Sequence, residues 1–149
     1  MKTSLAAALL ISPTCQSLTE GKAAMSNPGV LIAEDNDELR ELFSFALAGI
    51  GFEVRVAVDG QDALNALSQS RPDVLVTDVM MPYLNGIDLI RAVRSCRELA
   101  ELPIVVLSAY PDYLSEAFVA GANKVIRKPV ELDELCETVL RMLPLDAGH

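Results

Sequence analysis

Residues 73–86, DVLVTDVMMPYLNG, join a short apolar run to an aspartate, Asp78, and then to a turn that contains proline and glycine. The run at 74–77 is continuous rather than alternating, which is typical of a strand buried on both faces of a parallel sheet. An aspartate at the end of such a strand is most often a turn residue or a helix cap. What ends the other strands decides whether Asp78 has a further role.

Strand and helix patterns alternate five times from Val30 onward. The expected strands cover 30–33, 53–58, 74–77, 104–108 and 124–126. The expected helices, whose apolar residues recur at helical spacing, cover 36–50, 60–69, 86–97, 112–120 and 131–143. In the fourth helix we expect Leu114, Ala117 and Phe118 to face inward. The alternation predicts an α/β fold, a doubly wound five-stranded parallel sheet of order 2-1-3-4-5 with flavodoxin-like (βα)5 topology.

Polar residues follow four of these strands. The first strand runs into Glu34 and Asp35, the third ends in Asp78, the fourth ends in Ser108, and the fifth leads to Lys128. In a sheet of this order, ligands bind outside the carboxyl ends of strands 1 and 3. The sequence therefore predicts a cleft that holds three carboxylates, a hydroxyl and an ammonium group. The second strand is placed at the sheet edge, so we interpret Asp59 at its end as a turn residue.

Three neighbouring carboxylates repel one another unless a cation lies between them. Mg²⁺ (or Mn²⁺) is the expected cofactor, because hard divalent ions prefer oxygen ligands. We expect Asp35 and Asp78 to be direct ligands and Glu34 to hold a bound water. A carboxylate is also a nucleophile toward phosphorus, and Ser108 and Lys128 are suited to binding phosphoryl oxygens.

The chain from about Val30 to Leu143 resembles the response-regulator receiver domain of two-component signalling. The shared motifs are LIAEDND (31–37), VTDVMMPYLNG (76–86), VVLSA (105–109) and VIRKP (125–129). The resemblance implies a bacterial phosphoacceptor protein rather than an enzyme with a separate substrate. Asp78 would receive its phosphoryl group from a phosphohistidine on a sensor histidine kinase or a histidine phosphotransfer protein.

The resemblance also assigns roles to residues around the acceptor. The backbone carbonyl of Met80 would be a further ligand of Mg²⁺, the Lys128-Pro129 peptide would be cis, and Ser108 would follow the phosphoryl group inward on activation. Receivers usually carry Tyr or Phe three residues before the lysine, whereas this chain has Val125, so the usual aromatic switch is missing. Met80 and Tyr110 would flank the approach of the hydrolytic water.

Output would pass through protein contacts. We expect a stand-alone receiver, a single domain at 25–149 with its core at about 29–143. By resemblance, the helix at 36–50 docks the donor, and a downstream target binds the fourth helix, fifth strand and fifth helix. The main alternative is a receiver-fold docking module that acts without phosphorylation. It would have lost the acceptor, the acidic pair or the lysine, and this chain keeps all of them.

Enzymes of the same fold class fit less well. A dinucleotide or FMN site needs a phosphate-binding turn after the first strand, but EDNDE at 34–38 would repel a phosphate. A haloacid-dehalogenase-type phosphatase has a second aspartate two residues after its nucleophile, where this chain has Met80.

Composition limits the partners and the compartment. The chain has 149 residues and a net charge of −9, which disfavours nucleic acid or an anionic membrane as a partner. Its three cysteines, Cys15, Cys96 and Cys136, form no C-x-x-C pair. We interpret them as packing residues and expect a cytoplasmic protein.

The first 24 residues are expected to lie outside the fold. MKTSLAAALLI resembles the start of a secretory signal, but no clean cleavage site follows it. Met25 opens a segment that reads like a natural protein start. We favour an amino-terminal extension or an over-long start assignment over a working signal.

Overall fold

The computed structural model describes residues 27–144, so the predicted extension at 1–24 lies outside the described residues. Five parallel strands form one sheet in the order β2-β1-β3-β4-β5, as predicted. The strands are β1 (Gly29–Ala33), β2 (Glu53–Ala57), β3 (Val74–Asp78), β4 (Ile104–Ser108) and β5 (Lys124–Arg127). This order places the carboxyl ends of β1 and β3 side by side, where the chain reverses its direction of travel across the sheet.

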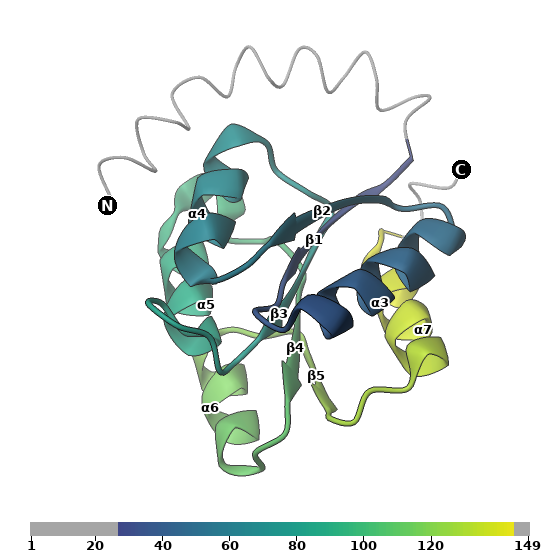
Figure 1. Cartoon of the computed structure of the whole chain (residues 1–149). Helices are drawn as coiled ribbons and strands as arrows, with labels where there is room; N and C mark the ends of the chain where they lie inside the picture. Colours follow the sequence, from purple (N-terminus) through teal and green to yellow (C-terminus); the bar gives the residue numbers. More distant parts are fainter. Residues whose placement is uncertain (1–26, 145–149) are drawn as a thin grey trace.

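Helices cover both faces of the sheet (Figure 1). They are α3 (Asp37–Gly49), α4 (Gly60–Gln69), α5 (Gly86–Ser95), α6 (Asp112–Ala120) and α7 (Leu132–Met142), with a short 3-10 helix, η1 (Arg97–Leu99). Helices α3 and α7 lie on one face, and α4, α5 and α6 lie on the other. No helix within residues 27–144 is long and apolar enough to cross a membrane.

Alternate residues of the central strands supply two separate cores. Val30 and Ile32 of β1 pack under α3 and α7, whereas Leu31 and Ala33 pack under α4, α5 and α6. All five residues of β3 are buried, which confirms that the continuous apolar run is a strand covered on both faces. The acidic end of this strand is therefore held by packing on both sides.

Short polar side chains cap the first turns of α3, α4 and α5. The Asn36 side chain accepts a hydrogen bond from the amide of Leu39 (2.9 Å) at the start of α3. Asp59 does the same for Asp62 (2.7 Å) at the start of α4. Each satisfies an amide that the first helical turn leaves unpaired. Asp59 thus has a structural role outside the cleft, in keeping with our interpretation of it as a non-site residue.

Two local predictions need correction. Phe118 does not face inward: it is 52% exposed, whereas Ala117 is fully buried. Adjacent helical residues point about 100° apart, and the small Ala117 side chain lets α6 approach the sheet closely, which leaves Phe118 at the margin. The third helix ends at Ser95 rather than at residue 97, because Cys96 has an extended backbone (φ −96°, ψ 122°) before η1 begins.

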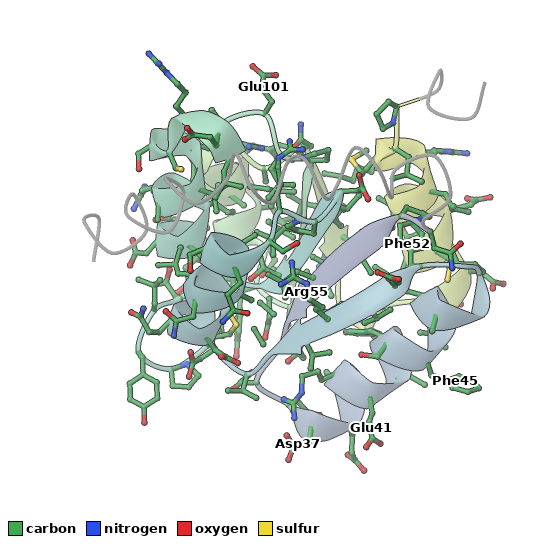
Figure 2. The ribbon with its side chains drawn as sticks, turned by 90° about the horizontal axis from the view of Figure 1, so that it is seen from above. Asp37, Glu41, Phe45, Phe52, Arg55 and Glu101 are labelled. Atoms are coloured by element: carbon green, nitrogen blue, oxygen red, sulfur yellow. The ribbon has the colours of Figure 1, made fainter. Side chains whose placement is uncertain are left out.

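The outer face of α3 is acidic and apolar at once. Phe45 is 81% exposed and points away from the sheet, as does Glu41 (Figure 2). Together with Glu38 and Leu42 they line a shallow open depression on this helix.

Candidate functional site

The carboxyl ends of β1 and β3 bring three carboxylates together. Oxygen atoms of Glu34, Asp35 and Asp78 all lie within 4.8 Å of one another. Glu34 is fully buried and Asp78 is 6% exposed, whereas Asp35 is open to solvent. The donor set of three close oxygen ligands, one of them accessible, fits a hard divalent cation. The cluster predicted from the strand ends is therefore present.

Lys128 supplies the positive charge inside the cluster. Its Nζ lies 3.2 Å from Oε1 of Glu34 and 3.2 Å from Oδ2 of Asp78. The Lys128 amide donates to the carbonyl oxygen of Ser108 (2.9 Å), which anchors this segment to the end of β4. The Lys128-Pro129 peptide is cis, as the resemblance implied. One ammonium group thus contacts two buried acids.

The remaining carboxylate oxygens are fixed by backbone amides. Oδ1 of Asp78 accepts a hydrogen bond from the amide of Val79 (2.8 Å). Oε2 of Glu34 accepts one from the amide of Asn36 (3.2 Å). The two acids therefore hold defined orientations at the ends of their strands.

Burial raises the pKa of both acids. For Glu34, loss of solvation raises the pKa most, and the negative charge of Asp78 adds to it. For Asp78, loss of solvation again dominates, and Asp35 raises the pKa further. Lys128 acts in the opposite direction on both. Positive charge at this site would favour the ionised carboxylates, which agrees with the expectation of a cation.

Ser108 ends β4, the strand next to β3, but its hydroxyl forms hydrogen bonds with Tyr110. The side chain is 1% exposed, and its Oγ accepts a hydrogen bond from the amide of Tyr110 (3.1 Å) and donates one to the Tyr110 carbonyl (3.2 Å). Leu107 pairs with Asp78 across the β3–β4 ladder, so Ser108 stands one residue beyond the acceptor's level. The hydroxyl is thus bonded within its own loop.

The residues expected to control switching and water access belong to β5 and to the segments that follow β3 and β4. Val125 pairs with Val106 in the β4–β5 ladder, is half-buried, and packs against the core beneath α4, α5 and α6. Met80 is 49% exposed and Tyr110 is 54% exposed. The Tyr110 ring meets Tyr113 edge to face, with ring centroids 6.1 Å apart. The part that Met80 takes in metal binding stays a prediction.

Two supporting residues were missed by sequence reasoning. Arg40 of α3 donates from Nη1 to the backbone carbonyl of Glu34 (2.9 Å) and so ties that helix to the acidic segment. Gly86 lies so close to the acceptor that a β-carbon there would stand 2.2 Å from the carbonyl oxygen of Asp78. Its position directly after the helix cap Asn85 was the available signal, since only glycine permits such an approach.

Comparison with known proteins identifies the family to which the chain is similar. The family model described as the response regulator receiver domain matches residues 30–140. Response regulator MprA of Mycobacterium bovis is 38% identical over 127 residues, which is 80% of this chain and 54% of that protein. This chain thus spans about half the length of the curated relatives it matches.

Solved structures agree with this sequence match. Chemotaxis response regulator CheY4 of Vibrio cholerae has a TM-score of 0.75 at 32% identity, covering 79% of this chain and 100% of that one. The receiver domain of sensor histidine kinase PA1611 from Pseudomonas aeruginosa has a TM-score of 0.74 at 25% identity, covering 83% and 100%. That domain was solved with a magnesium ion coordinated in its active-site cleft. With its fold, its acidic cleft and these matches, the chain belongs to the response regulator receiver domain family.

Proposed function

We propose that this protein accepts a phosphoryl group on Asp78 from a phosphohistidine donor in a Mg²⁺-dependent reaction. The observation that carries the proposal is the environment of Asp78. Its side chain ends a buried strand, its Oδ2 faces Lys128, and two further carboxylates lie within 4.8 Å. A receiver that docks partners without phosphorylation would not need this set of groups.

The chain's own residues suit an in-line transfer. An oxygen of Asp78 would attack phosphorus, a P–O bond would form, and the P–N bond would break with its electron pair returning to the donor imidazole. The Val79 amide orients the carboxylate through Oδ1 (2.8 Å). Lys128 would turn its ammonium group from Asp78 to a phosphoryl oxygen. Ser108 would release Tyr110 to bind another.

Glu34, Asp35 and Asp78 would hold the divalent ion, Mg²⁺ or Mn²⁺, with the Met80 carbonyl as a further ligand. When bound, the ion would neutralise charge on the phosphoryl oxygens during transfer. The close oxygen atoms of the three carboxylates support this assignment, and the magnesium ion in the PA1611 receiver domain supports it by analogy.

The partners are proposed from the surfaces around the cleft. A sensor histidine kinase or a histidine phosphotransfer protein would dock beside α3, where Leu42 and Phe45 are exposed next to acidic side chains. A downstream target would bind the face formed by α6, β5 and α7, where Phe118, Val119 and Leu140 are exposed. Signalling through such contacts needs no chemistry beyond Asp78.

Small phosphodonors test the proposal directly. Phosphoramidate or acetyl phosphate with Mg²⁺ should add a single phosphoryl group of about 80 Da, seen by intact-mass spectrometry. The Asp78→Asn variant should gain none, because an amide is not a nucleophile of this kind. If both proteins are labelled equally, Asp78 is not the acceptor.

A further inference from the structure

Tyr83 has an unusual backbone conformation in the loop that follows the acceptor. Its φ is +69°, and within residues 27–144 no other residue except glycine has a positive φ. The amide of Leu84 donates to the carbonyl of Pro82 (2.7 Å), so Tyr83 is the central residue of a γ-turn. A γ-turn with positive φ is rare and strained, and a bulky side chain makes it less favourable still.

Packing of the Tyr83 ring does not compensate for this conformation. The Tyr83 side chain is 92% exposed, so its ring gains almost no packing. Asparagine or glycine would hold the same turn with less strain. Strained residues persist where the surrounding structure holds them, and they cluster at functional sites. The ring therefore points to a partner outside the molecule.

The loop holds this ring in a fixed place. The amide of Gly86 donates to the carbonyl of Val79 (2.8 Å), which closes the loop across its base. Met81 is buried, and Leu84 packs against the core beneath α4, α5 and α6. A β-carbon on Gly60 would stand 2.1 Å from the carbonyl oxygen of Leu84, so the loop also lies against the first turn of α4. Tyr83 is thus presented on a braced support.

The place of this loop indicates the kind of partner. A protein that transfers a phosphoryl group to Asp78 must bring its phosphohistidine within bonding distance of the carboxylate. Its surface then covers the chain that follows the acceptor, starting with the exposed Met80. A target that reads phosphorylation needs a surface that changes, whereas a braced ring suits a donor that must recognise the unphosphorylated protein.

The charges near the loop indicate which charge the donor surface should carry. Two exposed acids lie beside the loop: Asp35 in the carboxylate cluster and Asp88 in the first turn of α5, where it pairs with Arg91 (3.3 Å). The chain as a whole carries a net charge of −9. A tyrosine ring buries a large area at little conformational cost, and tyrosine is enriched among residues that dominate interface energies. We propose that Tyr83 is a specificity-determining contact for the phosphohistidine donor protein and enters an apolar recess with a basic rim. The inference rests on the proposed function.

Comparing a small phosphodonor with a protein donor distinguishes the Tyr83 contact from the phosphorylation chemistry at Asp78. The probes are phosphoramidate and the autophosphorylated histidine kinase of the same genome that labels the unsubstituted protein fastest. Tyr83→Asn should raise KM for the phosphorylated kinase about tenfold, equivalent to about 1.4 kcal/mol. Phosphoramidate is too small to reach the ring and should label both proteins at the same rate. Tyr83→Phe, which keeps the ring, should retain most of the kinase reaction.

Stability and a matched variant complete the test. Because asparagine tolerates positive φ, Tyr83→Asn should melt at the same temperature as the unsubstituted protein or higher. Val56→Ala removes an exposed apolar side chain from β2, the edge strand of the sheet, and should react normally with the kinase.

An unchanged KM in Tyr83→Asn would overturn the inference, as would an equal loss with phosphoramidate or an equal loss in Val56→Ala. If phosphoramidate fails to label Asp78 in the unsubstituted protein, the proposed function itself fails, and this inference fails with it.

Discussion

Lys128 lies 3.2 Å from a carboxylate oxygen of Glu34 and 3.2 Å from one of Asp78, so one ammonium group compensates two buried acids. Asp35, the third acid, is exposed. One positive charge faces three carboxylates. Burial raises the pKa of both buried acids most, and the negative charge of a neighbouring acid raises it further. At the scale of single residues, the site has room for added positive charge.

The same imbalance predicts a pH dependence of stability in metal-free protein. Because the pKa of Glu34 and of Asp78 is higher in the folded than in the unfolded chain, the folded state binds more protons, and stability falls as pH rises above the unfolded values. With EDTA present, the melting temperature should therefore rise as pH is lowered from neutral toward the unfolded pKa values of the two carboxyl groups. Glu34→Gln should weaken this dependence, whereas Glu53→Gln, at an exposed position of β2, should not. A metal-free melting temperature that falls on acidification through this range would contradict the assignment.

Two side chains near the cleft should set how long the phosphoryl group lasts. By resemblance to the family, Met80 and Tyr110 flank the approach of the attacking water. A thioether is a weak hydrogen-bond acceptor and cannot orient water as an amide can, and the Tyr110 ring would partly cover the phosphoryl group. We therefore expect slow hydrolysis, with Met80→Asn plus Tyr110→Ala hydrolysing at least about tenfold faster, a barrier change of about 1.4 kcal/mol. Loss of radiolabel after removal of the donor measures both rates, and equal decay would show that water access here does not control the lifetime.

At the scale of elements, Arg94 of α5 connects this helix to the loops at the end of the sheet opposite the carboxylate cluster. Its guanidinium donates to the carbonyl oxygens of Gly121 (2.8 Å) and Leu102 (2.7 Å) and to Oδ1 of Asn123 (2.9 Å). A β-carbon on Gly121 would stand 2.8 Å from the Arg94 side chain, so the turn after α6 fits closely around it. One side chain thus ties α5 to the segments that enter β4 and β5.

Removing this link should destabilise the fold without changing the chemistry at Asp78. Arg94→Ala leaves several partly buried carbonyls unpaired, and we expect a loss of about 2–4 kcal/mol in urea unfolding. Arg91→Ala, on the same helix but 55% exposed at its side chain, should cost less than about 1 kcal/mol. The phosphoramidate labelling rate should be the same in both variants, since the site lies at the opposite end of the strands. Equal stability losses would show that the Arg94 contacts contribute no more than surface pairs.

The helices and strands also show which features could be predicted from the sequence. The strands β3 and β4 were predictable because burial on both faces selects unbroken apolar runs, and Gly121 predicted the end of α6 because its φ of +126° suits glycine. The clustering of Glu34 and Asp78 followed from the sheet order alone. The exposure of Phe118 could not be foreseen, since it depends on how closely α6 approaches the sheet. The Ser108 hydrogen bonds depend on loop conformation in the same way.

At the scale of the whole molecule, the cleft joins strand ends from both sides of the point where the sheet order reverses. Glu34 follows β1, Asp78 ends β3, and Lys128 follows β5. These groups therefore meet only when the sheet is assembled. A cation bound there binds the native state and has no equivalent site in the unfolded chain. Stability of the entire domain should then respond to the metal.

Mg²⁺ should therefore raise the melting temperature of the protein. At about ten times its dissociation constant, a ligand specific for the native state adds about 1.4 kcal/mol, which corresponds to roughly 4–8 °C for a domain of this size. Asp35→Ala should abolish the response if Asp35 binds the ion as proposed, and the protein should stay folded because Asp35 is exposed and has no part in the core. Glu101→Gln removes an exposed carboxylate outside the cluster (Figure 2) and should leave the response intact. Differential scanning calorimetry with and without Mg²⁺ makes the comparison. A shift that survives in Asp35→Ala would exclude this residue as a ligand, and the same loss in Glu101→Gln would indicate a general charge effect instead of a site.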